Sequence, residues 1–155
     1  SAYTGVPLTA RGYATGVRVL TYYINTAISA EAWKHLASFE DTLVFYMTGN
    51  ALTQLVNNLL KAGADAAIPF IVVEQATTPN QYVHQFTLGQ FNNQLHPEFL
   101  SPSLVIMGKV TALYKQFAWL PNNKERKQYF KPLQNFPELI SLINNTQQLS
   151  HVSRA

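Results

Sequence analysis

Three short apolar runs, each bounded by turn-forming residues, constrain the fold of this chain more than any other feature. The runs are Thr42–Met47, Pro69–Glu74 and Ser103–Met107. Each has the length of one strand and carries apolar side chains at successive positions, as does a strand that is buried on both faces. Because such strands need a layer of chain on either side of their sheet, the runs predict an α/β architecture.

Two further segments are typical of strands. Val17–Ile24 is rich in β-branched and aromatic residues, and Tyr82–Leu88 alternates in the way expected of a more exposed, antiparallel strand. We therefore predict a mixed sheet of about five strands flanked by helices. The helical signals are Ser29 as the N-cap of a helix through Phe39, an apolar stripe on Ala51–Lys61 with its C-cap at Gly63, a short helix at Phe91–Leu95 and a helix over Ala112–Trp119.

The composition suits one domain in 155 residues, of which 47% are hydrophobic and only 12% are charged. The absence of cysteine excludes a disulfide scaffold, a thiolate metal site and a cysteine nucleophile. No apolar run approaches the length of a transmembrane helix, so we expect no membrane partner. The chain starts at Ser1 without an initiator Met, and we expect translation to begin upstream.

The net positive charge of the chain comes from its last part, residues 121–155. The net charge is +3, yet residues 1–120 hold six Lys or Arg and six Asp or Glu. A domain without net charge is a poor binder of phosphate backbones, so we expect no nucleic-acid partner. We divide the chain into a domain, residues 1–120, and a polar, basic tail, residues 121–155. Its composition predicts a solvated extension, partly helical or disordered.

The residues by themselves predict no catalytic and no metal centre. No two glycines form the GxG of a phosphate-binding loop, no Gly-x-Ser-x-Gly is present, and the four histidines are scattered. Three loops beside predicted strands are candidates for ligand binding, because open α/β sheets bind ligands at strand ends. They are Gly5–Gly12, Met47–Asn50 and Glu74–Gln81.

At these three loops the sequence resembles the uroporphyrinogen-III C-methyltransferases of the tetrapyrrole methylase family. The motifs GVPLTARGYA, DTLVFYM and VEQATTPNQ occur in the family's order and approximate spacing, and SPSLVIMGKVTALYKQFAWL resembles its closing strand and helix. The resemblance is specific because four separated motifs match together. It covers residue 1 to about residue 120, and EQATTP favours the uroporphyrinogen branch.

The resemblance implies that the chain is the C-terminal domain of an S-adenosylmethionine-dependent enzyme. Such an enzyme methylates uroporphyrinogen III at C2 and C7 to give precorrin-2, for siroheme and cobalamin biosynthesis. In the family, the cofactor loop and the catalytic residues belong to an N-terminal domain that has no counterpart here. The implied partners are therefore the tetrapyrrole substrate, that N-terminal domain and a second subunit of a cytoplasmic homodimer. The chain alone is expected to be inactive.

The resemblance carries three functional residues over to this sequence. Met47 matches a Met that contacts S-adenosylmethionine, and Ala76 falls where the family has a small residue that lets the backbone approach the cofactor. Arg11 matches the Arg of the PLT-x-R motif; it either pairs with a propionate of the substrate or ties a loop near the domain junction. The sequence departs from the family at Ala10, often His there, and at Tyr82, commonly basic.

Two other functions remain open on the sequence. One is another branch of the family, with a corrinoid, RNA or a diphthine-type modified histidine as acceptor; the neutral domain argues against RNA. The other is a non-catalytic interaction or dimerisation module. The coding sequence upstream of Ser1 separates the module from the enzyme: a Gly-rich methylase half there favours the enzyme, and a start codon favours the module. The half-enzyme should also expose an apolar patch toward its missing half.

Overall fold

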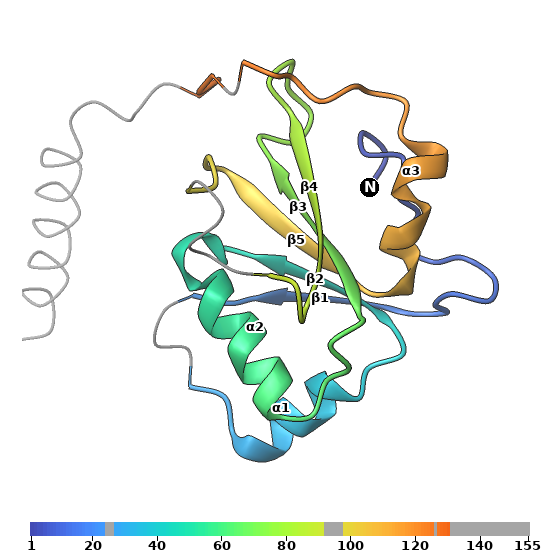
Figure 1. Ribbon diagram of the computed structural model, residues 1–155, viewed down its shortest axis with the longest axis vertical. Coiled ribbons are helices and arrows are strands. Elements are labelled where there is room, and N and C mark those ends of the chain that lie inside the picture. Colours follow the sequence, from blue (N-terminus) through green and yellow to red (C-terminus); the bar gives the residue numbers. More distant parts are fainter. Residues whose placement is uncertain (24–26, 92–97, 126, 131–155) are drawn as a thin grey trace, which may run out of the picture.

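A five-stranded mixed sheet forms the centre of the computed structural model, which describes residues 1–23, 27–91, 98–125 and 127–130 (Figure 1). The strands lie in the order β1-β2-β5-β3-β4. The predicted α/β class, the mixed sheet and the five strands are confirmed.

The strand bounds agree closely with the apolar runs. β1 (Val17–Thr21) pairs in parallel with β2 (Thr42–Tyr46), and all other pairs are antiparallel. β5 (Ser103–Met107) lies between β2 and β3 (Pro69–Glu74), and β4 (Tyr82–Thr87) forms the far edge, antiparallel as predicted. β1 is shorter than predicted, since it ends at Thr21.

Two helices lie on one side of the sheet (Figure 1), and they begin and end close to the predicted residues, although α1 ends at Ala37, two residues before the predicted Phe39. The Ser29 hydroxyl accepts the Ala32 N–H at 3.2 Å at the start of α1 (Ala30–Ala37). A short 3₁₀ turn, η1 (Gly49–Ala51), precedes α2 (Leu52–Lys61). Gly63 follows the Ala62 C-cap with φ +96°, and its N–H donates to the Leu60 carbonyl in a Schellman motif.

The helix predicted over Ala112–Trp119 differs from the observed one. A 3₁₀ segment, η3 (Lys109–Leu113), leads into a single α-helical turn, α3 (Tyr114–Phe117). The helix stops because Ala118 turns to an extended ψ of 117°, and the Trp119 indole N–H donates to the Ala2 carbonyl at 2.8 Å. Residues 92–95 of the predicted short helix lie outside the described residues. No helix in the described ranges is long and apolar enough to cross a membrane.

The sheet has a separate core on each face, because successive side chains of a strand point in opposite directions. α1 and α2 cover one face, whereas the N-terminal segment and η3 cover the other. The first core contains the buried residues Leu43, Phe45, Leu55, Leu59, Phe70 and Met107, and the second contains Val6, Val44, Ile71, Ile106 and Val110. Burial on both faces, predicted for the three apolar runs, is confirmed for residues 42–45, 70–74 and 105–107, whereas Tyr46 and Met47 at the end of the first run are exposed.

Gly5 fixes the N-terminal segment against the end of α3. Its φ is +74°, and a Cβ there would collide with the Phe117 carbonyl. We predict that Gly5→Ala lowers the free energy of unfolding by about 2–4 kcal/mol, because left-handed strain and overpacking add. Gly12→Ala is the matched control: φ is +82°, no atom lies within 4 Å, and the loss should be about 1 kcal/mol. Urea denaturation measures both, and equal losses would contradict this packing.

Candidate functional site

The direction of the strands brings two of the three loops to one edge of the sheet. β2 and β3 run the same way because each is antiparallel to β5 between them. Leu104 of β5 pairs with Tyr46 on one side and with Val73 on the other. Met47 and the Glu74–Gln81 loop therefore leave the sheet at the same end, from strands about 10 Å apart, which is two interstrand spacings.

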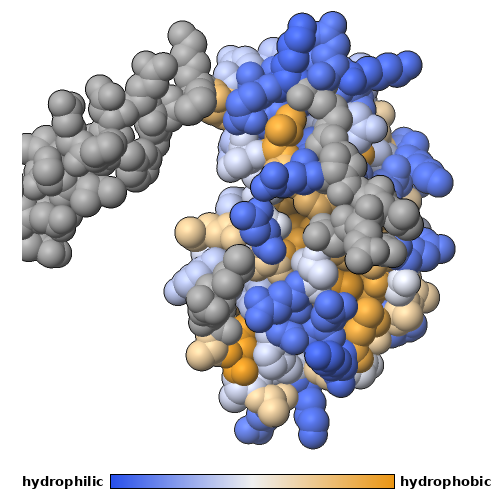
Figure 2. Space-filling view, turned by 60° about the vertical axis from the view of Figure 1, so that its left-hand side comes forward, coloured by the Kyte–Doolittle hydropathy of each residue, from blue (hydrophilic) through white to orange (hydrophobic). Residues whose placement is uncertain are grey.

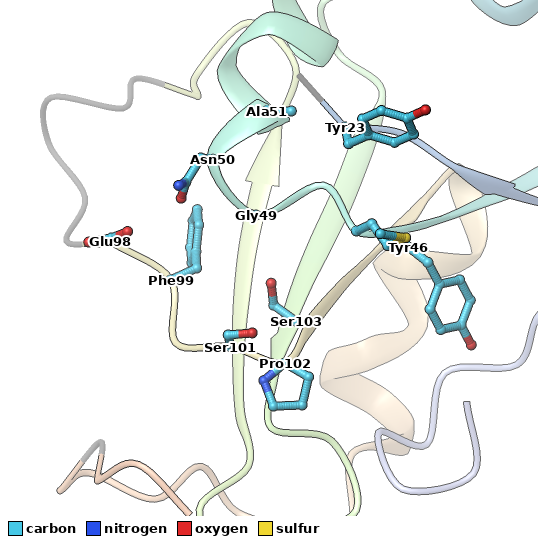
Figure 3. A pocket seen from close by; sticks show the side chains of 11 residues that line it. Tyr23, Tyr46, Gly49, Asn50, Ala51, Glu98, Phe99, Ser101, Pro102 and Ser103 are labelled. Carbon is cyan, nitrogen blue, oxygen red and sulfur yellow. The ribbon is translucent and has the colours of Figure 1, made fainter. Parts of the chain in front are cut away.

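Met47 is displayed rather than packed. Its backbone is left-handed with φ 61°, and its side chain is 68% exposed. The side chain lines an open pocket of about 750 Å³ formed by the end of β1, the turn after β2 and the segment leading into β5. Figure 3 shows Tyr23 on one side of this pocket and Phe99 on the other. The remaining lining residues are Tyr46, Gly49, Asn50, Ala51, Glu98, Ser101, Pro102 and Ser103.

Glu74, the acid at the start of EQATTP, holds one wall of this pocket in place. Its carboxylate is buried, and Oε1 accepts the Leu100 N–H at 2.8 Å. The same oxygen lies 3.4 Å from Nε2 of His84 on β4. Sequence reasoning assigned no role to Glu74, although an acid that ends a buried apolar run was a signal for such a contact.

Ala76 lies in a loop with a constrained backbone. Its two neighbours, Gln75 and Thr77, have φ values of 46° and 71°. Left-handed backbone at a residue other than glycine costs about 1–3 kcal/mol, so surrounding contacts must hold it. Ala76 lines a second cavity, of about 240 Å³, which shares no lining residue with the Met47 pocket. The other lining residues are Ser1, Ala2, Tyr3, Thr4, Val73, Thr77, Leu104 and Ile106.

Two polar side chains of this loop, those of Thr78 and Gln81, bond to the backbone of the loop itself and of the N-terminal segment. The Thr78 hydroxyl donates to the Gln75 carbonyl at 2.8 Å. The buried Gln81 amide accepts the Thr77 N–H at 3.1 Å and donates to the Tyr3 carbonyl at 3.3 Å. The Gln75 N–H donates to the Pro102 carbonyl at 2.7 Å, so the loop is tied to the N-terminal segment and to the segment before β5. From this loop, Ala76 and Thr77 line the Ala76 cavity.

Arg11 lies apart from the other two predicted residues. It occupies an exposed turn in which Ala10 and Ala14 exchange two backbone hydrogen bonds of 3.1 Å. Because this turn precedes β1, it lies at the opposite end of the sheet from Met47 and Ala76 (Figure 1). Within the described residues the Arg11 guanidinium makes no hydrogen bond or ion pair. No contact in this part of the chain therefore supports the loop-tying role.

Apolar side chains are exposed on the face of the sheet that the N-terminal segment covers only partly. Val19 of β1 is 65% exposed, and Tyr46, which lies diagonally across from it, is 46% exposed. Trp119 and Tyr3, with ring centroids 5.8 Å apart, are also exposed. In Figure 2, which brings the left-hand side of Figure 1 forward, apolar surface lies open between hydrophilic side chains.

Comparisons with known proteins agree on one family. The family model of the Tetrapyrrole (Corrin/Porphyrin) Methylases matches residues 1–92. The siroheme synthase of Escherichia fergusonii is 37% identical over 123 residues, 79% of this chain and 26% of that protein. Native uroporphyrin III C-methyl transferase from Thermus thermophilus superposes with a TM-score of 0.59 at 27% identity, covering 72% of this chain and 49% of that one.

A second structure of the Thermus thermophilus enzyme, complexed with S-adenyl homocysteine, has the same TM-score of 0.59 at 26% identity. It covers 72% of this chain and 47% of that one. The chain thus spans about a quarter of the length of the siroheme synthase and about half of the solved transferases.

Proposed function

The chain belongs to the tetrapyrrole methylase family, and from this premise we propose that it forms one half of an S-adenosylmethionine-dependent uroporphyrinogen-III C-methyltransferase. The observation that carries the proposal is the juxtaposition of two motifs at one edge of the sheet. DTLVFYM ends at the exposed Met47, and EQATTP begins where β3 ends. The identity to siroheme synthase and the bound S-adenyl homocysteine of a solved relative support it.

The residues at this edge suit the methyl donor. S-adenosylmethionine supplies, when bound, an electrophilic methyl group on a positively charged sulfur. The Met47 side chain offers a soft, apolar contact to the adenosyl group, which explains why a thioether is 68% exposed at a strand end. The small Ala76 side chain keeps its cavity open to a ligand. The inward bonds of Gln81 and Thr78 hold the backbone of the loop in place for that contact.

This half of the enzyme binds and orients. The proposed reaction is two methyl transfers to C2 and C7 of uroporphyrinogen III, giving precorrin-2. Each transfer needs the acceptor carbon, the methyl group and the sulfur in line, a geometry that rigid strand ends provide. Acid–base groups come from the N-terminal domain, and the chain contributes no catalytic residue of its own. A cytoplasmic setting is compatible with the absence of cysteine.

The exposed apolar side chains support the proposed partners. Val19 and Tyr46 are large apolar groups on a regular sheet face, and such surface is expected where a second body packs. We assign this surface to the N-terminal domain and, in the homodimer, to the second subunit. The alternative, a stand-alone interaction module, would present the same surface without turnover.

The first test is methyl transfer itself. The natural-length protein that contains this chain should convert uroporphyrinogen III and S-adenosylmethionine to a product heavier by two methyl groups, measured by mass spectrometry. Residues 1–155 alone should give no such product, because the cofactor loop and the catalytic residues of the proposed enzyme belong to its N-terminal domain. Turnover by this chain alone would overturn the half-enzyme, and no turnover by the natural-length protein would favour another branch of the family or the module.

The second test concerns the cofactor edge, with S-adenosylhomocysteine as the probe in calorimetry of the natural-length protein. Ala76→Leu fills the cavity and should weaken binding about 30-fold. Met47→Ala removes apolar contact and should weaken it about tenfold, whereas Met47→Leu should stay within about threefold. Ala67→Leu, an exposed alanine at the other end of β3, is the control. If Ala76→Leu and Ala67→Leu bind S-adenosylhomocysteine with equal affinity, Ala76 is not part of the cofactor site.

The third test decides the role of Arg11. If its guanidinium pairs with a substrate propionate, Arg11→Ala should raise the KM for the tetrapyrrole at least about tenfold and leave S-adenosylhomocysteine binding unchanged. Arg11→Lys should be intermediate, because an ammonium cannot form the two parallel bonds. Arg18→Ala, on exposed β1, is the matched control. An unchanged KM in Arg11→Ala would exclude the substrate role.

A further inference from the structure

The described residues that follow Pro121 cross the loop that carries Ala76. We name them the strap, residues 121–125 and 127–130. The strap lies outside residues 1–92, which the family model matches. It makes hydrogen bonds to the Glu74–Gln81 loop, to β4 and to the segment before β5. These bonds set it apart from a solvated extension.

The strongest contact of the strap is with Gln75. The Gln75 side chain is 0% exposed, and both ends of its amide bond to strap backbone. Nε2 donates to the Lys127 carbonyl at 3.0 Å, and Oε1 accepts the Tyr129 N–H at 2.6 Å. Without the strap, a buried donor and a buried acceptor lose these partners beside Ala76.

The strap also holds the far side of the loop. The Asn80 amide donates to the same Lys127 carbonyl at 3.0 Å. The Asn123 amide donates to the Pro79 carbonyl at 3.1 Å and to Asn80 Oδ1 at 3.0 Å. The Asn123 N–H bonds the Gln81 carbonyl at 3.2 Å. The strap therefore binds the loop on both sides of Ala76 and Thr77.

Asn122 anchors the strap to the edge of the sheet. Its amide pairs with β4 as a neighbouring strand would: Oδ1 accepts the Val83 N–H at 2.8 Å, and Nδ2 donates to the Val83 carbonyl at 3.0 Å. The Tyr114 hydroxyl lies 3.4 Å from the same Oδ1. This hydroxyl donates to Asn122, and burial, and to a smaller extent the nearby Tyr82, raises the pKa of Tyr114.

A last contact joins the strap to the Met47 pocket. The Gln128 amide donates to the Ser101 carbonyl at 2.6 Å, and Ser101 lines that pocket. One strap thus bonds the Ala76 loop and a wall of the Met47 pocket. The two proposed cofactor contacts lie at the ends of different strands, and the strap connects segments that carry or face both.

We propose that the strap is a positioning element for the methyl donor: through Gln75 it holds the Glu74–Gln81 loop in the conformation that presents Ala76. This inference rests on the proposed function. The loop needs external support because residues other than glycine adopt left-handed backbone on both sides of Ala76. The hydrogen bonds of the strap supply that support, and Gln75 acts through the loop without touching the cofactor.

The experiment removes one strap hydrogen bond and leaves the loop sequence intact. Tyr129→Pro deletes the N–H that Gln75 Oε1 accepts, whereas Tyr129→Ala keeps it and removes only an exposed ring. In the natural-length protein, Tyr129→Pro should weaken S-adenosylhomocysteine binding about tenfold, the effect of one orphaned buried acceptor. Tyr129→Ala should stay within about twofold. At saturating methyl donor, kcat should change by less than about twofold in both variants.

Hydrogen exchange of the 75–81 amides without ligand is the second readout. It should be faster in Tyr129→Pro than in Tyr129→Ala, while β2 and β3 remain protected. Should Tyr129→Pro fail to fold, Asn123→Ala removes the bonds to Pro79 and Asn80 instead and should weaken binding about threefold.

If Tyr129→Pro and Tyr129→Ala bind S-adenosylhomocysteine with the same affinity, whether unchanged or equally weakened, the role of the strap is overturned while the proposed function stands. If Tyr129→Pro does not fold, an unchanged affinity of Asn123→Ala for S-adenosylhomocysteine would likewise overturn the role of the strap. If the unaltered natural-length protein does not bind S-adenosylhomocysteine, the proposed function fails and the role of the strap in donor binding fails with it. The exchange data would then show only whether the strap holds the loop.

Discussion

The insertion of β5 between β2 and β3 sets the direction of the two strands that carry the candidate site. Because β5 is antiparallel to both neighbours, β2 and β3 run in the same direction and end at the same edge. Main-chain hydrogen bonds fix this register, and a slip by one residue would turn every side chain to the other face. Both cores, the exposure of Met47 and the position of the Ala76 loop follow from this pairing.

Buried amides and one buried carboxylate convert that edge into a shaped site. Glu74, Gln75 and Gln81 are all buried, and each forms hydrogen bonds with a segment distant in the sequence. A buried polar group is stable only with its partners in place, so these bonds specify one arrangement of the loops. The low charge and high amide content of the chain suit such a structure, because amides donate and accept without the desolvation penalty of ions.

The elements with local signals were predictable. The N-cap at Ser29 and the Schellman glycine at Gly63 act within one turn of helix, and the apolar runs report burial directly. The end of α3 was not predictable, since the chain that leaves it at Ala118 contacts a distant segment, where Trp119 donates a hydrogen bond to Ala2 near the other end of the chain. The composition of the tail favours a solvated extension, because composition does not show whether an Asn side chain bonds to water or to protein. The Asn122 side chain bonds to a strand edge.

The amino-acid sequence was sufficient to predict the family and the strands that carry Met47 and Ala76, and the family resemblance singled out these two residues and Arg11 as candidates for the site. Residue identity and hydrophobic periodicity are local properties, and they survive in a single sequence. The folded structure was needed to show that Met47 and Ala76 share an edge while Arg11 lies at the opposite end, and that Gln75 is held by residues 127 and 129. The positions of the first three residues depend on strand order and main-chain pairing, which are nearly independent of side-chain identity. The last contact joins the Gln75 side-chain amide to backbone that is distant in the sequence, and no local pattern reports such a contact.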